Sequence, residues 1–571
     1  EELSNLISTS IKENLETNLG TIAKSGSKDF VSKLKSVKEK DKLNIIGQFG
    51  VGFYSAFMVG DNVEVITKEH GKQTYKFSSD GKDNYSIEDL TSNELDDSGT
   101  IVRIYLKKST KENNFDNYLE EWTIKDLVTK YSDYVRYPIK METSKQVHDK
   151  DKDGKDIPDK FHEEKSVDTL NSMVPLWKKN KKDIKEKDLN EFYKNKFMDF
   201  EDPFTSLSIN VDGIISYSGL VYIPSHPPYD LYSENYEKGL DLYAKGIFIQ
   251  SKCKDLIPDY LKFCKGLVDS NDFSLNISRE ILQQSPILRK ISENIEMKVI
   301  GKLKDILKTD KEKYLAFYKN YGDFLKYGIY QSYGSKTETL NDLLMYYSLK
   351  QDKYITLKEY KDSIIKGQKS IYYASGKSLD AIKLLPQIEK YKKEGIDVLL
   401  CDARIDEFCI MMMKSYDKTD FINIATENKE DEISKKEAAN VGKISTENKR
   451  LLDNLTEALK GKVDAVSISS KLVDSPVCIS SKEGISTNME KVLSEEPGAK
   501  NSAKAKKVLE LNPTHPIFTY LSKIQSEDEN VKNYASILLD EALLLEGSEI
   551  EDKPSFIKKI NELMIKALNS K

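Results

Sequence analysis

Alternating hydrophobic and polar positions predict antiparallel strands in the first part of the chain. Apolar side chains alternate over 62–66 and 74–77, on either side of His70-Gly71, and again over 99–106. A period of two is typical of strands with one buried face, and His-Gly between two such runs fits a turn. Asp212-Gly213 also lies between two alternating runs, which predicts a second hairpin further along the chain.

Helical spacing predicts one long helix and a pair of helices at the C-terminus. Apolar residues recur at steps of three and four from Leu288 to Ile306, which is typical of one buried helix face. Two shorter stripes near the end are separated by Glu546-Gly547 and Pro554. The pattern fits a pair packed on its own domain as well as a dimerisation surface. We adopt the dimerisation interpretation. The residues predicted for that surface are Tyr534, Leu538, Ala542, Leu545, Phe556, Ile560 and Leu563.

Charged and polar segments indicate how the chain divides. A chain of 571 residues is too long for one hydrophobic core. One highly charged stretch follows the first strands and a polar stretch lies near residue 430. The predicted parts are an N-terminal domain over 1–147, a charged linker over 148–170, a middle domain over 171–428 and a C-terminal domain over 429–571.

Composition narrows the class of protein. The chain has 88 basic and 94 acidic residues, a net charge of −6, whereas a nucleic-acid-binding protein should carry a basic excess. Its five cysteines include no C-x-x-C pair, which predicts reduced, buried thiols. No apolar run reaches the ~18 residues that a membrane span needs. We therefore expect a cytoplasmic protein that binds neither nucleic acid nor membrane.

The strongest local motif is a glycine-rich loop that leads into Tyr54-Ser55-Ala56-Phe57. Glycines allow close approach of the backbone, so successive N–H groups can point at a phosphate, and a helix start adds its positive end. The loop lacks the Lys-Ser/Thr of a P-loop and the glycine order of a dinucleotide fingerprint. A tight turn before a helix explains the loop alone equally well. Its residues are Gly47, Gln48, Phe49, Gly50, Val51, Gly52 and Phe53.

Two stretches together resemble a known family. N-L-G-T-I-A-K-S-G over 18–26 and G-Q-F-G-V-G-F-Y-S-A-F over 47–57 are similar to the lid and the second glycine motif of the ninety-kilodalton heat-shock chaperones. That family shares its ATPase domain with gyrase, histidine kinases and mismatch-repair proteins. Residues 239–284 look like the family's middle domain, and 474–478 and 511–516 look like its C-terminal domain. The detailed pattern is similar to the bacterial branch.

The resemblance implies an α+β multidomain fold. Its parts are a partial GHKL-type (Bergerat) ATPase α/β sandwich, an α/β middle domain and a mostly helical C-terminal dimerisation domain. ATP and Mg²⁺ are the implied cofactors. Besides Gly47–Phe53, the implied ATP contacts are Asn18, Leu19, Lys24, Ser25 and Thr100. Arg279 is the implied catalytic residue near the γ-phosphate, Gln283 lies one turn later, and Met489 is an implied client contact.

The resemblance also implies the mode of action and the partners. A homodimer would close as a clamp on unfolded or partly folded client proteins when ATP binds. A DnaK-type chaperone is a candidate partner, and the bacterial cytoplasm is the implied location.

The start of the chain departs from the family pattern. Family members carry a water-activating glutamate and a magnesium-binding asparagine on a first helix, and then a D-x-G-I-G-M motif before the lid. Residues 1–19 contain neither glycine nor aspartate, and their glutamates lie too close to the lid to match the water-activating one: Glu1, Glu2, Glu13 and Glu16. We therefore expect these 571 residues alone to bind little ATP and not to hydrolyse it. The alternative function is a truncated, ATP-independent holdase or scaffold. A topoisomerase or mismatch-repair subunit fits the net charge poorly.

Overall fold

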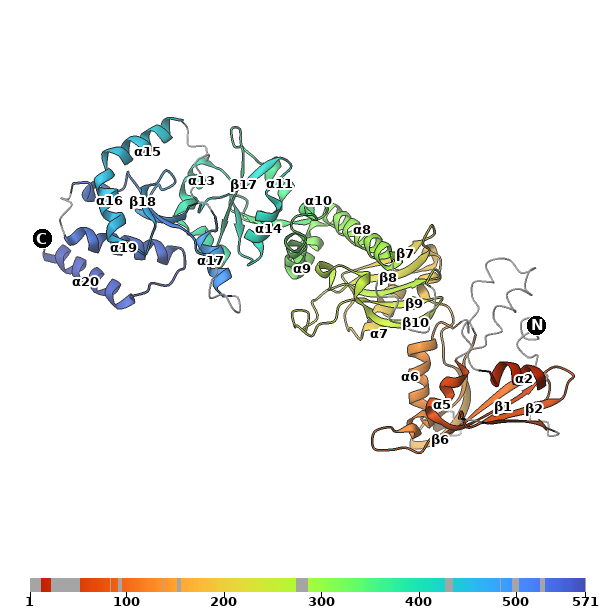
Figure 1. Cartoon of the computed structure of the whole chain (residues 1–571). Coiled ribbons are helices and arrows are strands. Elements are labelled where there is room, and N and C mark those ends of the chain that lie inside the picture. The colour runs from red at the N-terminus through yellow and green to blue at the C-terminus, as the bar shows by residue number, and fades with distance from the viewer. Residues whose placement is uncertain are drawn as a thin grey trace. The chain divides into compact units, whose positions relative to one another are not determined.

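A computed structural model forms two compact units (Figure 1). The first comprises Glu1–Ser225, Tyr232–Pro258 and Cys264–Ile295, and the second comprises His226–Leu231, Asp259–Phe263 and Glu296–Lys571. Both combine helices with sheets, which confirms the α+β prediction at this level. The predicted boundaries near residues 147, 170 and 428 fall inside these units and stay predictions. The structure describes residues 12–21, 52–82, 84–90, 95–135, 137–150, 156–273, 286–426, 435–482, 484–495, 503–523 and 529–569.

A four-stranded antiparallel sheet opens the first unit, in the order β3-β2-β1-β4. Its alternating sequence buries Val63, Val65 and Phe77 on one face. The turn predicted at His70-Gly71 joins β1 to β2, and Gly71 has a φ of +69°, which glycine adopts without strain. The elements are α2 (Lys12–Leu19), η1 (Phe53–Ser55), α5 (Ala56–Val59), β1 (Gly60–Lys68), β2 (Thr74–Ser79), β3 (Tyr85–Leu90), β4 (Gly99–Leu106), η2 (Phe115–Leu119) and α6 (Glu121–Ser132).

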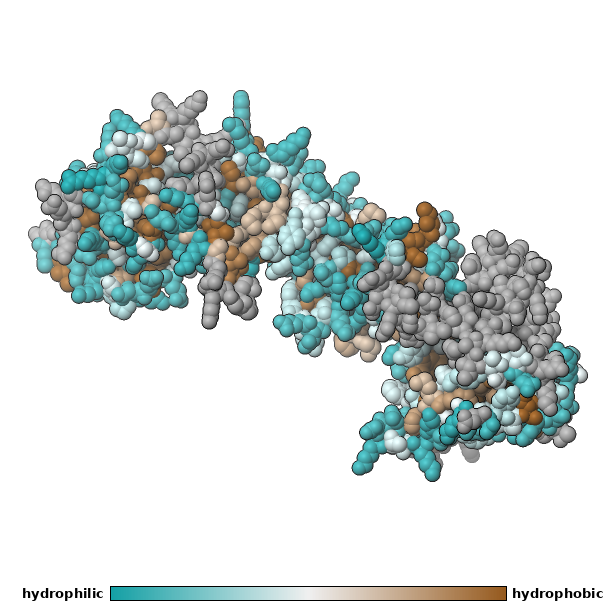
Figure 2. All heavy atoms as spheres, viewed as in Figure 1, coloured by the Kyte–Doolittle hydropathy of each residue, from teal (hydrophilic) through white to brown (hydrophobic). Residues whose placement is uncertain are grey.

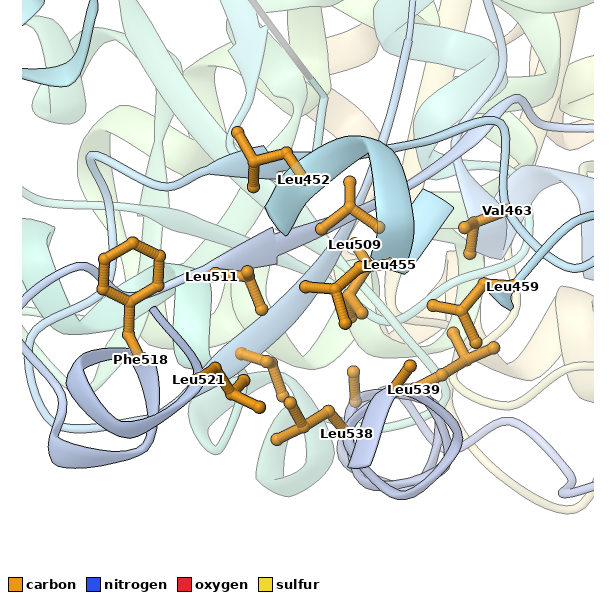
Figure 3. Packing of buried hydrophobic residues seen from close by; sticks show 14 of the residues in the cluster. Leu452, Leu455, Leu459, Val463, Leu509, Leu511, Phe518, Leu521, Leu538 and Leu539 are labelled. Carbon is orange, nitrogen blue, oxygen red and sulfur yellow. The ribbon is translucent and has the colours of Figure 1, made fainter. Parts of the chain in front are cut away.

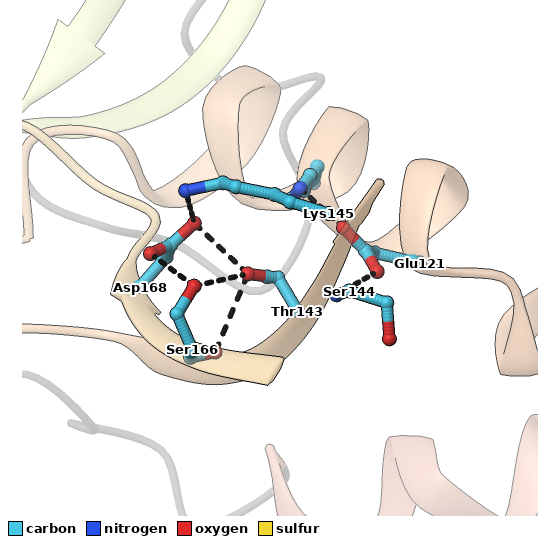
Figure 4. A network of polar contacts seen from close by, with 7 residues as sticks. Glu121, Thr143, Ser144, Lys145, Ser166 and Asp168 are labelled. Carbon is cyan, nitrogen blue, oxygen red and sulfur yellow. Dashed lines mark hydrogen bonds and ion pairs between the residues drawn. The ribbon is translucent and has the colours of Figure 1, made fainter. Parts of the chain in front are cut away.

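Most of the predicted charged linker is a strand in the structure. β5 (Lys140–Lys150) and β6 (Asp156–Thr169) pair as an antiparallel hairpin. Polar side chains bond across it: the carboxylate of Asp168 lies 2.9 Å from the ammonium of Lys145 and accepts hydrogen bonds from the hydroxyls of Thr143 and Ser166 (Figure 4). Charged residues are compatible with a two-stranded ribbon because cross-strand pairs of opposite charge stabilise it.

A five-stranded sheet in the order β10-β9-β11-β8-β7 completes the first unit. The hairpin predicted at Asp212-Gly213 is confirmed, because β7 and β8 pair antiparallel from Thr205↔Ile223 to Val211↔Tyr217. β11 pairs antiparallel with β8 and parallel with β9. The elements are α7 (Glu186–Phe197), β7 (Thr205–Val211), β8 (Tyr217–Ile223), β9 (Leu240–Ala244), β10 (Ile247–Cys253) and β11 (Lys265–Ser270), with short 3-10 turns η3 (Leu176–Lys178), η4 (Lys181–Asp183), η5 (Lys254–Leu256) and η6 (Asp259–Leu261).

The predicted long helix is α8 (Pro286–Thr309), and it contains the whole apolar stripe. All six residues of the stripe are buried: Leu288, Ile291, Ile295, Val299, Leu303 and Ile306. α9 (Lys311–Gln331) follows, and its first turn is capped by Asp310, whose carboxylate accepts the backbone N–H of Lys313 at 2.9 Å.

A six-stranded sheet in the order β13-β12-β15-β14-β17-β16 lies in the second unit. Its core includes Tyr372, Ala374 and Leu400 from the strands and Ile388 and Tyr391 from the helical side. The elements are α10 (Thr337–Leu340), η8 (Asn341–Leu343), β12 (Met345–Ser348), β13 (Lys353–Thr356), α11 (Leu357–Asp362), β14 (Ile371–Ser375), α12 (Leu379–Lys383), η9 (Pro386–Ile388), α13 (Glu389–Glu394), β15 (Leu399–Cys401), α14 (Asp406–Met413), β16 (Ser415–Tyr416) and β17 (Thr419–Asn423).

A three-stranded sheet in the order β18-β20-β19 carries the C-terminal helices. Leucines from α16, β20 and α19 meet in one apolar core, with Leu455, Leu509 and Leu538 among them (Figure 3). The predicted C-terminal helix pair is confirmed as α19 and α20. The elements are α15 (Lys435–Glu447), α16 (Lys449–Ala458), β18 (Ala465–Ile468), β19 (Val477–Ser481), α17 (Thr487–Ser494), β20 (Lys507–Leu511), α18 (Pro516–Leu521), α19 (Glu529–Leu545) and α20 (Lys553–Asn569).

The surface and the cysteines agree with the composition. Hydrophilic side chains cover most of the face seen in Figure 2, with smaller hydrophobic areas between them. All five cysteines are buried and unpaired, as predicted for reduced thiols. Of the helices in the described ranges, none has the length and apolar content to cross a membrane.

Candidate functional site

Leu19 and Phe53, two of the implied ATP contacts, lie together on the first sheet. The hydroxyl of Tyr54 donates to the backbone carbonyl of Leu19 at 2.7 Å, which joins the end of α2 to the turn after the glycine loop. Leu19 and Phe53 both pack against the buried cluster of Val63, Val65 and Phe77. Burial raises the pKa of the Tyr54 phenol above its ordinary value, which favours the protonated, hydrogen-bond-donating form.

Thr100 faces the same side of that sheet. It is the antiparallel partner of Thr67 on β1, and the two hydroxyl oxygens are 2.9 Å apart. Directly opposed residues share a face, and residues two apart on a strand do too. Thr67 therefore shares the face of Val65 and Val63, and Thr100 joins Leu19 and Phe53 there.

Gly52 shows no structural need for glycine. Its φ of −59° and ψ of −38° are helical values that any residue adopts, and a Cβ added there meets nothing within 4 Å. A ligand that approaches the backbone closely would still require glycine at this position. Asn18 lies exposed in the last turn of α2. The other implied ATP contacts lie outside the described residues: Lys24, Ser25, Gly47, Gln48, Phe49, Gly50 and Val51.

The described residues fit one end of ATP. An apolar layer beside a pair of hydroxyls suits an aromatic base, which needs flat contact area and a few hydrogen bonds. Within the described ranges, no group of three His, Cys, Asp or Glu side chains that could hold a metal ion is found. We derive no step through Mg²⁺.

Arg279 and Gln283 lie outside the described residues, but the chain on both sides of them is held firmly. The carboxylate of Asp272 accepts the backbone N–H of Ser216 at 2.6 Å. The hydroxyl of Tyr217 donates to the side-chain oxygen of Asn294 at 2.6 Å. One short stretch after the β7–β8 turn therefore anchors both flanks.

Asp269, near the end of β11, connects this strand to Trp177, Lys178 and Gly246. It was not singled out from the sequence. Its buried carboxylate accepts the indole N–H of Trp177 and the backbone N–H of Gly246, both at 3.1 Å, and pairs with Lys178 at 2.6 Å. An aspartate directly after the apolar pair Leu267-Val268 is the signal that could have marked it.

The residues predicted for dimerisation divide into two groups. Leu538 and Ala542, 4% and 1% exposed, are core residues of their own unit, and Tyr534 packs against that core. Leu545, Phe556, Ile560 and Leu563 are half-buried. A different face of α20 is exposed and carries Ile557, Met564, Ile565 and Leu568.

Met489, the implied client contact, is only 5% exposed. It lies in the first turn of α17, and the residues around it donate hydrogen bonds to two carboxylates. Glu407 from α14 accepts hydrogen bonds from Ser486 and from Asn488, the latter at 2.9 Å. Glu546 at the end of α19 accepts the hydroxyl of Thr487 at 2.8 Å, and its backbone carbonyl accepts the ammonium of Lys491 at 2.9 Å.

Comparison with known proteins agrees with the resemblance. The family model described as Hsp90 protein matches residues 146–571. The chain is 43% identical over 555 residues to "Chaperone protein HtpG" of Clostridium botulinum (strain Langeland), covering 97% of this chain and 87% of that protein. The HtpG of Shouchella clausii (strain KSM-K16) is 43% identical over 556 residues, with 97% and 87% covered. The chain belongs to the Hsp90 family. Its similarity to bacterial HtpG proteins confirms the predicted branch.

Proposed function

We propose that this Hsp90-family chaperone uses ATP to drive a dimeric clamp that binds unfolded or partly folded proteins and assists their folding. The observation that carries the proposal is 43% identity over nearly the whole chain to proteins named HtpG chaperones. The GHKL-type character of the first domain, the middle domain and the C-terminal dimerisation domain belong to the same proposal, as does a location in the bacterial cytoplasm.

The nucleotide would lie on the face of the first sheet that carries Thr100. We assign the adenine end to the apolar layer of Leu19 and Phe53 and to the hydroxyl pair of Thr67 and Thr100. This assignment rests on their common face and on the 2.9 Å between the hydroxyls. Asn18, Lys24, Ser25 and the loop from Gly47 to Gly52 are proposed for the lid and the phosphates.

Arg279 and Gln283 are proposed to act on the γ-phosphate. ATP would supply the phosphoryl group, and its transfer to water would reset the clamp that nucleotide binding closes. A fixed guanidinium offsets the negative charge that develops on that group, and an amide one helical turn later can donate a second hydrogen bond. The resemblance of residues 239–284 to the family's middle domain supports this assignment.

The proposed dimer forms through the C-terminal helices, and the proposed client surface includes Met489. The exposed apolar residues of α20 support a contact with a second copy, since apolar side chains on one helix face favour association. A DnaK-type chaperone remains the proposed partner. Because Met489 is buried, α17 must move before a client can reach it.

The central test is suppression of aggregation. The 571-residue chain is mixed with a thermally unfolding model enzyme, and light scattering is followed with and without ATP. We expect reduced scattering, and a further change on adding ATP would show that these 571 residues themselves use the nucleotide. Suppression that is identical with and without ATP would support the holdase alternative, and no suppression in either case would contradict the chaperone assignment.

The catalytic proposal is tested with Arg279→Ala. In a chain that turns over ATP, this variant should lower turnover by tenfold or more while nucleotide binding is retained, because the arginine contributes mainly in the transition state. Lys262→Ala, an exchange at a described position outside the implied site, is the control. Unchanged turnover in Arg279→Ala would refute the role.

A further inference from the structure

A cavity of about 210 Å³ lies in the second unit, away from every residue assigned above. Four stretches of chain line it: the turn after α11, strand β14, helix α13 with Ile396, and Ser470-Lys471 before β19. It therefore lies where the six-stranded sheet and the three-stranded sheet of one compact unit meet.

The floor of the cavity is aromatic. Tyr372 and Tyr391 are both buried in the core of the six-stranded sheet, and their ring centroids are 4.9 Å apart at an angle of 56°. Ile365 and Ile396 add apolar surface beside them. Such a floor favours a flat, apolar group over a hydrated ion.

The walls are cationic. Lys366, Lys390 and Lys471 line the cavity, and Glu394 is the one acidic residue among the lining side chains. Glu394 lies 3.8 Å from Lys390, a long and partly exposed ion pair that contributes little. Lys366 and Lys471 are the lining ammonium groups outside that ion pair, in a chain whose net charge is −6.

Lys471 is the residue that most needs an anion. It is 8% exposed, and its ammonium donates to the backbone carbonyls of Ile424 at 3.0 Å and Thr426 at 2.8 Å. Within the part of the chain that the structure describes, no carboxylate pairs with it. A buried ammonium has three N–H donors, so two carbonyls leave one donor and the full charge without a counter-charge.

We propose that this cavity binds a small aromatic anion: a flat ring carrying a phosphate or carboxylate group. The ring would lie against Tyr372 and Tyr391, and the anionic group would pair with Lys471, with Lys366 and Lys390 at the rim. The bound molecule would hold the two sheets of the second unit together. The proposal is independent of the nucleotide site and of the client surface.

Ligand-observed saturation-transfer NMR with phenyl phosphate tests the site, with phenol and inorganic phosphate as comparison probes on the full chain. We expect saturable binding of phenyl phosphate that weakens as salt is added, and weaker binding of each comparison probe. Phenol binding as tightly as phenyl phosphate would overturn the anionic part of the proposal. Inorganic phosphate binding as tightly would overturn the aromatic part.

Two lysine variants locate the binding. Lys366→Met, at an exposed rim position, should weaken phenyl phosphate binding about fivefold without affecting the fold. Lys393→Met, an exposed lysine of the same helix α13 that does not line the cavity, is the matched control. Lys471→Met should weaken binding tenfold or more, once circular dichroism shows that it folds. Affinities equal to the unmodified chain in both Lys366→Met and folded Lys471→Met would rule the site out.

Discussion

The hydroxyl of Ser486 lies 2.9 and 2.7 Å from the two carboxylate oxygens of Glu407, although the residues are 79 positions apart. The side-chain amides of Asn488 and Asn423 and the hydroxyl of Ser375, the last at 2.5 Å, also donate to this buried carboxylate. The start of α17 is therefore attached to the six-stranded sheet by hydrogen bonds from neutral groups. Such bonds can be broken without leaving a new charge behind.

Weakening this attachment should loosen α17. Ser486 also caps the helix, because its hydroxyl oxygen accepts the backbone N–H of Met489 at 3.0 Å. Ser486→Ala removes both contacts, which should cost about 1 kcal/mol. We expect amide hydrogen exchange over 486–494 to rise about fivefold. Ser494→Ala is the control, since that hydroxyl bonds only the carbonyl of Lys491 at the exposed end; equal exchange in the two variants would contradict the attachment.

Removal of the Asp269 carboxylate should destabilise the first unit. Asp269→Ala leaves the buried indole N–H of Trp177 and the ammonium of Lys178 without their acceptor. The cost should be about 3 kcal/mol, as for other broken buried pairs. Calorimetry should show a lower melting temperature for that unit. Asp202→Ala, which breaks the more exposed pair with Lys194, should cost less than about 1 kcal/mol.

Fluorescence adds a local readout for the same variant. The chain has two tryptophans, the buried Trp177 and the exposed Trp122. In a Trp122→Phe background, emission reports on Trp177 alone. We expect a red shift in Asp269→Ala and none in Asp202→Ala.

The β5–β6 hairpin should become less stable in acid through Asp168. The hydrogen bond from Lys145 contributes most, and those from Thr143 and Ser166 add to it; together they lower the pKa of Asp168 from 3.8 to about 2 (Figure 4). Because the folded pKa is depressed, the stabilisation is complete above pH 3.8 and is lost as the pH falls towards about 2. Carbon-13 NMR titration of the carboxylate measures this pKa. In Lys145→Met it should move back towards 3.8, whereas Lys165→Met, on the Glu142 pair, should leave it unchanged.

The exposed face of α20 should control association of two copies. Ile557, Met564 and Leu568 lie on one side of the helix, because steps of seven and four residues return to nearly the same direction. Charged groups there should disfavour a dimer, so Ile557→Asp with Met564→Asp should give a monomer by light scattering. Glu562→Lys, on a polar side of α20, is the control.

A truncation that removes α20 alone should likewise leave monomers, because α19 stays in the core that it shares with α16 and β20. A dimer that survives both this truncation and the double exchange would rule out the C-terminal interface.

Elements were predictable from the sequence where the signal is local. Strand alternation near Val63, the hairpin turn at Asp212-Gly213 and the stripe from Leu288 to Ile306 are all confirmed. Each depends on the side-chain period of a single element or on one turn. The hairpin over 140–169 was missed because its charged side chains resemble those of a linker, and only pairing between the two strands shows that they form a ribbon.

The candidate site residues were assigned mainly through the family, and they stay predictions. The motifs at 18–26 and 47–57 indicated the Hsp90 family, and the family model and the relatives confirm it. The hydrogen bonds of Glu407 and Asp269 could not be predicted, because the sequence around an acidic residue does not show which groups donate to it. Those donors come from positions far away in the chain.

The sequence by itself determined the periodicities, the turns and the family membership, because each depends on residues that are close together in the chain. Tertiary structure decided which apolar faces are covered. Leu538 and Met489 are buried, Ile557 is exposed, and Lys471 lines a cationic cavity. The physical reason is that burial and hydrogen bonding depend on surfaces that meet only after folding, whereas one helix stripe looks the same whether it packs on its own sheet or on a second copy.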